Sequence, residues 1–576
     1  MAFDNSTAIP AGVGKNGATA HTQAVKASSI EVWAAFLGTL IVVSLGFGAL
    51  ASRQGMPSRD HIDFYLRVHE YDAEFRAGHW PQLLPDAVRG GGHAFPLLYP
   101  PLSHFAAAGI YRLDKDVVLA AHLSAMAAVL VGAAAMYTLL LTLTGQALPA
   151  MLSALTYSFL PYRATQLFIR GAFAEAWALA WYPFVLLGLL RWGRDGRLPG
   201  WWPLAVGAAI LSHTGVSLWA LPAMGLFALL SHGAPSRAGW GDLLLSSALA
   251  LGLAACYLLP VLRHLPDVRA ARSEWIAATP AAIGSSVGSW RFPGPLVAAE
   301  LVIVLGAFLL ILRSYRESTP TWNRTIGWAL LGQALFVSMS VAPESFWHVV
   351  PQPWRYLQFG WRLLGPAALM ISLGIGLLAA GFRSRVGQWT IVGLIALMAV
   401  VGGGQTRRSA LRDPTVTDRS VLREIRGAYS DLGFTLHGEY LPREANPESL
   451  GTMIARTREG LRQAGSEGRG QPGEVLRLTG THSAEEIALP LVAYDLFQAI
   501  DQDGRSLDTG SRAGQLTVVT TDQTREVRVR RRMAPTLTLG LLISGISALI
   551  VGLRALQILR PPAGPRARWL RAQCTG

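Results

Sequence analysis

Charged side chains are scarce in this chain of 576 residues. Asp, Glu, Lys and Arg make up 15% of the sequence, 51% is hydrophobic, and the mean hydropathy is +0.33. Soluble domains carry about 25% charged residues, so the composition excludes an ordinary soluble protein. Several apolar runs are long enough to cross a bilayer as helices, which satisfy their own backbone hydrogen bonds in lipid. The sequence predicts an α-helical polytopic membrane protein.

Cysteine is nearly absent as well. Cys256 lies in an apolar run and Cys574 in the C-terminal tail, which excludes a disulfide framework and a cysteine metal cluster. The formal net charge is +14, but no basic module with a readable motif is present, so we expect no nucleic-acid partner. Arg and Lys of this kind are typical of cytoplasmic loops that face anionic membrane lipids.

The apolar runs predict about twelve membrane segments, three of which are short for a full span. They are expected at 30–51, 118–143, 148–161, 173–190, 201–213, 216–231, 241–262, 294–313, 325–342, 361–381, 388–403 and 534–556.

Arginines in the short loops predict the orientation of the chain. Arg191, Arg237, Arg316 and Arg383 represent four loops that fall on one side if both termini are cytoplasmic, as in a bacterial inner-membrane protein. The resulting domains are a cytoplasmic tail (1–29), a transmembrane domain (30–403) with a large first outer loop (52–117), an extracytoplasmic domain (404–533), a final transmembrane helix (534–556) and a basic cytoplasmic tail (557–576).

The region 404–533 has the pattern of a small exported domain. Polar and apolar residues alternate in "QLTVVTT" and "EVRVRRR", and Asp503-Gly504 is a turn signal. Alternation with such a turn is typical of antiparallel strands. We expect a small β-rich, sandwich-like domain, with some helix before it, preceding the last membrane helix.

The first outer loop contains a concentration of ionisable groups. Phe64, Val68, Tyr71 and Phe75 recur at helical spacing, which predicts an amphipathic helix over about 61–77, lying along the membrane surface. Asp60 stands at its start, either as an N-cap or as a catalytic carboxylate, and the two roles are compatible.

Histidines add titratable groups to the same loop. His61, His69, His93 and His104 are ordinarily structural residues, but together with the carboxylates they leave a divalent metal site open. Further along, "GGGHAFPLLYPPLSHF" (90–105), which includes Tyr99, is either a rigid turn or a wall facing substrate.

Three further polar stretches lie at the predicted outer mouth of the helices. "PYRATQLFIRGAFAEAWALA" (161–180) contains Arg163, Arg170 and Glu175. Charges at that depth are costly and are usually paired or functional: Arg170 and Glu175 form an ion pair, or the guanidinium groups bind phosphate. His213 is a further polar position between two short segments.

The third stretch, "WRYLQFGWRLLGP" (354–366), interleaves Arg355 and Arg362 with aromatic side chains and includes Gln358. Aromatic residues are expected at a membrane boundary, and two arginines among them also suit an anionic lipid head group.

The order of these motifs resembles a known group. "LLYPPLSHF", "PYRATQLFIRGAFAE", "LSH" and "LQFGWRLL", followed by "LPLVAYDLFQAIDQDGRSL", are similar to the bacterial "6-pyruvoyl-tetrahydropterin synthase-related" membrane proteins, to YfhO-like proteins and to the wider GT-C glycosyltransferases. The resemblance implies a helical membrane fold, a lipid-linked sugar donor and a cell-envelope acceptor. It also implies that an acidic residue of the first loop, here Asp60, is a base or metal ligand. The arginines of the "RGAFAE" and "QFGWR" motifs correspond here to Arg170 and Arg362.

The resulting hypothesis is an inverting glycosyltransferase on the outer face of the membrane. Asp60 is the base, assisted by His61 or His69, with or without a divalent metal. Arg163, Arg170, Arg355 and Arg362 hold the donor phosphate, supported by Glu175, His213, Gln358 and Tyr99. The alternative is a non-catalytic scaffold or polymer-handling subunit that keeps the same fold. In the enzyme, Asp60, Arg170 and Arg362 converge on one outward cavity; in the scaffold they are scattered or locked in ion pairs.

Overall fold

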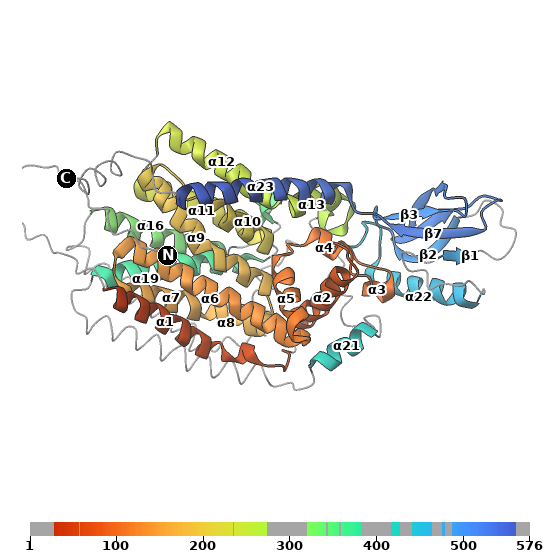
Figure 1. The fold of residues 1–576 in the computed structure, drawn as a ribbon, viewed down its shortest axis with the longest axis horizontal. Coiled ribbons are helices and arrows are strands. Elements are labelled where there is room, and N and C mark those ends of the chain that lie inside the picture. The colour runs from red at the N-terminus through yellow and green to blue at the C-terminus, as the bar shows by residue number, and fades with distance from the viewer. Residues whose placement is uncertain are drawn as a thin grey trace, which may run out of the picture.

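The computed structural model is elongated, with a bundle of helices at one end and a small β domain at the other (Figure 1). It describes residues 28–56, 58–233, 235–272, 320–340, 342, 344–355, 357, 359–381, 416–426, 440–463, 475–477 and 486–559. Helices dominate and the strands lie near the C-terminus, which confirms the predicted helical chain with a β domain before its last helix.

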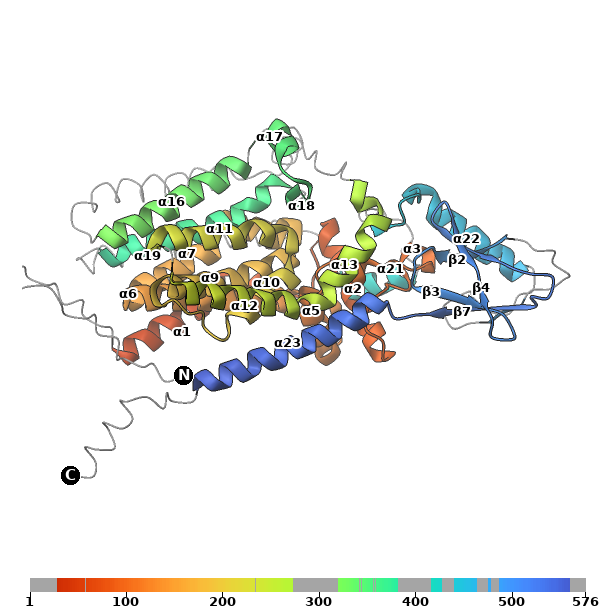
Figure 2. The ribbon, with the colours of Figure 1, turned by 90° about the horizontal axis from the view of Figure 1, so that it is seen from above.

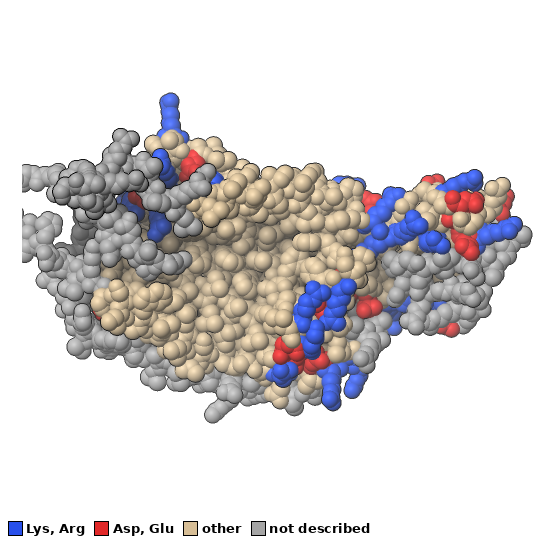
Figure 3. Space-filling view, viewed as in Figure 1, with Lys and Arg blue, Asp and Glu red and all other residues tan. Residues whose placement is uncertain are grey.

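Six helices of the described residues are long and apolar enough to cross a membrane. They lie at α1 (Ser29–Gly46), α6 (Val117–Thr144), α9 (Phe173–Asp195), α11 (Thr214–His232), α19 (Leu364–Gly381) with the turn before it, and α23 (Pro535–Leu559). The spans of α9 and α19 are mostly buried, whereas those of α1 and α23 are mostly exposed. Figure 3 shows a broad surface without charged residues over the helices, flanked by Lys, Arg, Asp and Glu at its ends, as expected for a lipid-facing band.

The predicted total of about twelve segments is not confirmed. A seventh span exists only if α12 (Arg237–Leu253) and α13 (Ala255–His264), which are bent by 72° at their junction, count as one. Two predicted segments are the short helices α7 (Ala147–Phe159) and α10 (Trp202–Ser212), and 325–342 corresponds to α16 (Pro320–Ser340), which is not among the six spans. The predicted segments 294–313 and 388–403 lie outside the described residues.

The predicted helix of the first outer loop is confirmed as α2 (Arg59–Arg76). It packs between the bundle and the β domain (Figure 1). Both its apolar and its acidic faces are covered, because Tyr65, Tyr71 and Glu70 are fully buried and Asp72 is almost fully buried. The expected N-cap role of Asp60 is wrong, because the helix starts earlier and Ser58 occupies the cap position. Asp60 lies in the first turn, where a carboxylate complements the helix dipole.

Three short elements complete the outer loop: α3 (Ala87–Gly90), α4 (Phe95–Leu98) and α5 (Leu102–Asp114). The first is a left-handed turn, with φ of 57° at Val88 and 55° at Arg89. Such angles are unusual for a β-branched residue and need support from outside. Arg458 of α22 (Pro447–Gln463) supplies it by donating hydrogen bonds to the carbonyls of Arg89 and Gly90.

The β domain is a sandwich of two antiparallel sheets, as the alternation predicts. The strands are β1 (Val475–Arg477), β2 (Glu486–Val492), β3 (Phe497–Ile500), β4 (Ser506–Leu507), β5 (Thr509–Arg512), β6 (Gln515–Val519) and β7 (Glu526–Arg531). One sheet has the order β1-β7-β3-β4 and the other β2-β6-β5. Side chains including Leu489, Leu516, Val527 and Val529 form one apolar core with a few residues of the outer loop.

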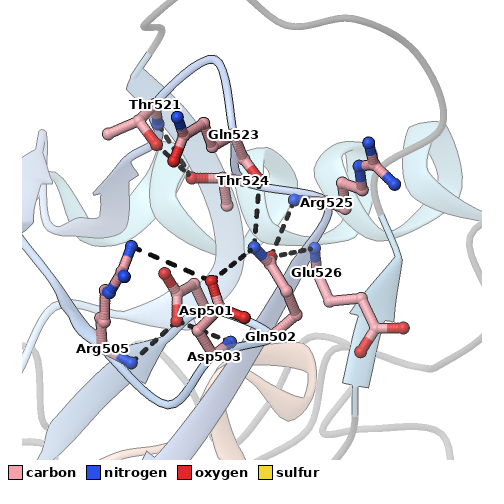
Figure 4. A network of polar contacts seen from close by, with 9 residues as sticks. All are labelled: Asp501, Gln502, Asp503, Arg505, Thr521, Gln523, Thr524, Arg525 and Glu526. Carbon is pink, nitrogen blue, oxygen red and sulfur yellow. Dashed lines mark hydrogen bonds and ion pairs between the residues drawn. The ribbon is translucent and has the colours of Figure 1, made fainter.

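Polar side chains fix two turns at one end of this sandwich (Figure 4). Asp501 accepts hydrogen bonds from the backbone of Asp503 and Arg505 around the predicted turn at Gly504, whose φ is 80°. Gln502 joins this turn to the next one, since its side chain accepts from the backbone of Arg525 and donates to the carbonyl of Gln523.

The β domain is attached to α2 by a buried ion pair. Arg531 of β7 contacts Glu74 through both nitrogens, with an Nη1–Oε1 distance of 3.0 Å. Nearby, Gln82 accepts a hydrogen bond of 2.8 Å from the backbone of Ala534, just before α23 begins. The chain that enters the last membrane helix is thereby held against the first outer loop.

Loss of this ion pair is expected to destabilise the protein. The two side chains are 6% and 13% exposed, so Glu74→Gln leaves the Arg531 charge buried without its partner, which costs about 3 kcal/mol. Thermal unfolding in detergent should show a lower midpoint for Glu74→Gln and a partial recovery for Glu74→Gln with Arg531→Gln. Arg505→Gln removes an exposed pair and is the control; an equal shift there would contradict the prediction.

Candidate functional site

A buried carboxylate, Glu175, organises a polar cluster at one end of the helix bundle. It lies in the first turn of α9 and is fully buried. Its Oε2 lies 3.2 Å from Nη1 of Arg170, at the end of the π-helical segment η2 (Thr165–Arg170), and 3.8 Å from Nε of Arg362. The other oxygen accepts a hydrogen bond from the hydroxyl of Tyr162, in α8 (Pro161–Ala164). The expected Arg170–Glu175 ion pair is therefore present, and it includes Arg362.

Arg362 reaches Glu175 from a distant part of the chain. It lies in the 3₁₀ turn η6 (Gly360–Leu363), which leads into α19. Its Nη1 donates a hydrogen bond of 2.9 Å to the carbonyl of Leu357, and its guanidinium lies 5.2 Å from the ring centre of Phe359. Arg170 lies in the same way 5.5 Å from the ring of Trp361. Aromatic faces at these distances stabilise both cations.

Asp60 and Tyr99 stand beside this cluster. Asp60 is exposed, and it is close enough to contribute to the raised pKa of Arg170, in which the attraction of Glu175, Tyr162 and Asp60 outweighs the opposing effect of burial. Burial raises the pKa of Tyr99, against the charges of Arg362 and Arg67, while Asp60 and Glu175 act in the same direction as burial. The pKa of Tyr99 therefore responds to both acids and to Arg362 and Arg67.

His213 faces the two arginines as a neutral ring. Burial, reinforced by Arg362 and Arg170, lowers its pKa well below the ordinary value. Its Nδ1 accepts a hydrogen bond of 3.3 Å from the backbone of Val216 at the start of α11. A neutral imidazole that accepts at one nitrogen carries its proton on the other, so Nε2–H is a donor.

The two histidines predicted to assist Asp60 have different surroundings. His61 is fully buried; its Nε2 lies 2.7 Å from the carbonyl oxygen of Leu167, and its Nδ1 contacts the hydroxyl of Ser58. Gly171, at φ +72°, lies so close that an added Cβ would be 2.7 Å from the backbone nitrogen of His61, so only glycine fits there. His61 thus attaches the start of α2 to the segment that contains Arg170.

His69 does not join the cluster. It is nine residues after Asp60 on the helix, which places it on the opposite face. Its Nδ1 lies 3.0 Å from the hydroxyl of Tyr111 in α5, and Asp86, Arg76 and Asp72 are the charges around it.

The remaining predicted arginines have other direct partners than Glu175. Arg163 is fully buried between α7 and α9, where its Nη1 lies 3.4 Å from Oε1 of Gln166 and its guanidinium lies 5.3 Å from the Tyr157 ring. Arg355, in α18 (Gln352–Arg355), donates to the carbonyls of Val350 and His348 and so closes the end of α17 (Glu344–Val349). Gln358 lies outside the described residues.

The donor atoms near Glu175 do not suit a divalent metal. Both oxygens of Glu175 are engaged by Tyr162 and the two guanidinium groups, which leaves the carboxylate of Asp60. In the described part of the chain, no three His, Cys, Asp or Glu side chains come together as metal ligands. The arrangement suits an anion, because two guanidinium groups face one carboxylate and His213 adds a neutral donor.

Two residues of the site were not predicted as site residues. Tyr162 is adjacent to Arg163 in sequence, but nothing in its neighbourhood indicates that its hydroxyl reaches Glu175. Arg67 lies seven residues after Asp60, on the same face of α2, 3.4 Å from Asp63 and 3.9 Å from the ring centre of Phe95. The seven-residue spacing from Asp60 is the feature of the sequence that could have identified Arg67.

Comparison with known proteins yields likenesses among solved structures. The chain is similar to the arabinofuranosyltransferase AftD from mycobacteria, solved by single-particle cryo-EM, with 14% sequence identity and a TM-score of 0.48. The match covers 87% of this chain and 40% of that one, so this chain spans about two fifths of the length of AftD. No protein-family model and no curated protein matches the sequence.

Acidification is expected to destabilise the fold, in part through His61. Burial lowers the pKa of His61 to about 3, against about 6.5 in an unfolded chain. Between these values the unfolded chain binds the proton more strongly, so the stability that neutral His61 contributes is complete above about pH 6.5 and is lost as the pH falls. The melting temperature should therefore fall less for His61→Gln than for the wild type between about pH 7.5 and pH 5. Equal falls would contradict this assignment.

Proposed function

We propose that this protein is a membrane glycosyltransferase of the GT-C type that uses a polyprenyl-phosphate-linked sugar on the extracytoplasmic face of a bacterial cytoplasmic membrane. The acceptor is a glycan or glycoconjugate of the cell envelope. The observation that carries the proposal is the meeting of Arg170 and Arg362 at Glu175, with Asp60 beside them, at one end of the apolar helices. The predicted twelve segments, cytoplasmic termini and domain boundaries belong to the same proposal.

The proposed reaction is a single displacement at the anomeric carbon. The acceptor hydroxyl attacks that carbon, the bond from the carbon to the phosphate oxygen breaks, and the polyprenyl phosphate leaves with the electron pair. Asp60, which is exposed, takes the proton of the hydroxyl. Arg170, Arg362 and the Nε2–H of His213 stabilise the charge that develops on the phosphate. Tyr99, whose pKa responds to Asp60 and to Arg362, is assigned to contact with the sugar in this mechanism.

Glu175 is a positioning residue in this mechanism. It touches neither the sugar nor the acceptor, but its charge holds the two guanidinium groups next to each other. A phosphodiester carries one negative charge, which two guanidinium groups and one carboxylate complement. His61 has a similar indirect role, because it fixes the first turn of α2 to the segment before Arg170.

The alternative, a non-catalytic scaffold or polymer-handling subunit, is favoured by one observation. Arg170 and Glu175 form a buried ion pair that is complete without a ligand. A scaffold would retain this pair for stability alone and would not transfer sugar from any lipid-linked donor.

Substitution of Asp60 separates the two functions. Loss of a general base costs about 100- to 10,000-fold in rate, so Asp60→Asn should lose turnover and keep its affinity for polyprenyl phosphate. Transfer is measured with purified protein in liposomes and a set of radiolabelled polyprenyl-phosphate sugars. Asp503→Asn, an exposed change in the β domain, is the control. Full activity of Asp60→Asn would remove the residue from its role, and no transfer by the wild type from any donor would favour the scaffold.

Substitution of Arg362 tests the phosphate site. Arg362→Gln should raise the KM for the donor about tenfold or more, because a charged hydrogen bond contributes about 1.5–3 kcal/mol. Arg355→Gln is the matched change, since its guanidinium binds backbone carbonyls away from Glu175. If both variants raised the KM equally, Arg362 would have no special role at the phosphate.

A further inference from the structure

The outer face of the four-stranded sheet has a row of arginines along β7. Val527 and Val529 point into the sandwich core, so the alternate residues Arg528, Arg530 and Arg532 lie on the opposite face, where all three are exposed. The α22 helix packs on β2 and β6 of the other sheet. Among the described residues, α22 therefore does not cover the three arginines, and Figure 3 shows Lys and Arg together with some Asp and Glu on the surface of the β domain.

The three charges are not neutralised by neighbouring acids. The strand register places Gln498 opposite Arg530 and Ile500 opposite Arg528. Arg532 donates a hydrogen bond of 2.7 Å to the side chain of Gln498, and none of the three forms an ion pair within the described residues. Glu526, the one acid of β7, lies at the end of the strand farthest from α23.

This arrangement is not explained by the usual role of charges on a sheet. Charged side chains at an edge strand prevent unwanted pairing with other sheets, but β7 is an inner strand with β1 on one side and β3 on the other. Alternate residues of a strand lie about 6.6 Å apart, so three like charges on one face repel each other and oppose folding. A negatively charged partner would remove that cost.

The direction of the strand favours a polymer over a lipid surface as the partner of the three arginines. Arg532 lies three residues before Pro535, where α23 begins, and β7 extends away from the bundle along the long axis of the molecule (Figure 2). Arg528 is therefore about 13 Å farther from the bundle than Arg532. A flat membrane contacts the nearest arginine, whereas an extended chain with negative groups at regular intervals contacts all three.

We infer that the outer face of β7 binds an extended anionic polymer, with repeating phosphodiester or carboxylate groups, as part of the acceptor. The inference relies on the proposed function for the identity of this polymer as an acceptor of the cell envelope. The neighbouring side chain Arg531 links β7 to Glu74 of α2, the helix that has Asp60 in its first turn. Glu74 lies about 20 Å along α2 from Asp60, so a polymer bound to β7 is held at a fixed distance from the proposed base.

The test measures binding, without sugar transfer, to the full-length protein in nanodiscs of neutral phosphatidylcholine. The probes are poly(glycerol phosphate), polygalacturonate and neutral dextran of similar length. The wild type should bind one or both polyanions and not dextran, and binding should weaken as NaCl is raised. The triple variant Arg528→Gln, Arg530→Gln and Arg532→Gln should bind at least about tenfold more weakly, since each lost contact removes part of a shared electrostatic attraction.

The matched control removes the same charge elsewhere in the domain, through Arg505→Gln, Arg512→Gln and Arg525→Gln. It should stay within about twofold of the wild type, because these side chains lie on β5 and on the turns of the domain. Melting temperatures identify a variant that does not fold, and Arg530→Gln alone, at an exposed position, then replaces the triple variant with a smaller expected loss.

Three outcomes would overturn the inference. They are no polyanion binding by the wild type, an equal loss in both triple variants, and binding only to vesicles with anionic phosphatidylglycerol, which would assign the row to lipid. Asp60→Asn should bind the polymers as the wild type does. Polymer binding with no transfer activity would therefore contradict the proposed function and leave the polyanion-binding role of β7 intact. Transfer activity without polymer binding would contradict the inference and leave the proposed function intact.

Discussion

The polar end of the helix bundle depends on a single buried charge, that of Glu175. A carboxylate and a guanidinium inside a protein are each expensive to remove from water, and the cost is recovered only when they pair with good geometry. Glu175 makes such contacts with Arg170, with Arg362 and with the hydroxyl of Tyr162. These groups come from two separate places in the chain, the stretch 161–170 and the turn η6, so one charge in the first turn of α9 fixes where η6 and η2 lie.

The same interaction leaves the site with a defined electrostatic character. Within the buried part of the cluster, two guanidinium groups face one carboxylate and retain positive charge, while Asp60 is exposed to solvent. His213, kept neutral by burial, adds a donor without adding charge. Water is largely excluded around Arg170, which is 6% exposed. Electrostatic attraction is stronger where water is excluded, and fixed donors need no reorganisation when a negative charge develops. A scaffold has no use for such an unbalanced charge, which is the physical reason to prefer an anion-binding function.

The sequence predicted those parts of the site that local chemistry determines. The periodicity of Phe64, Val68 and Tyr71 was sufficient for α2, and alternation was sufficient for β6 and β7. Arg170 and Arg362 could be proposed because charges are costly at the edge of a membrane. The N-cap was wrong at Asp60 because an acid in the first turn and one at the cap give almost the same pattern. The positions of Arg163 and Arg355 could not be predicted, because both are held by backbone or neutral groups that have no sequence signature.

The acidic face of α2 shows why pattern alone also misjudged the surroundings of that helix. A face with Asp63, Glu70 and Glu74 normally predicts contact with water, yet these side chains are buried. Partners elsewhere in the fold cover two of them: Arg531 of the β domain pairs with Glu74, and Glu70 accepts a hydrogen bond from the backbone of Asp86. Asp63 pairs with Arg67 of the same helix, and Arg458 supports the left-handed turn that follows. Their burial has a consequence for function. Because β7 and α2 are joined by a buried ion pair, the β domain cannot move freely relative to Asp60. Whatever binds that domain is therefore presented to the site in one orientation, which is what a transfer reaction requires of its acceptor.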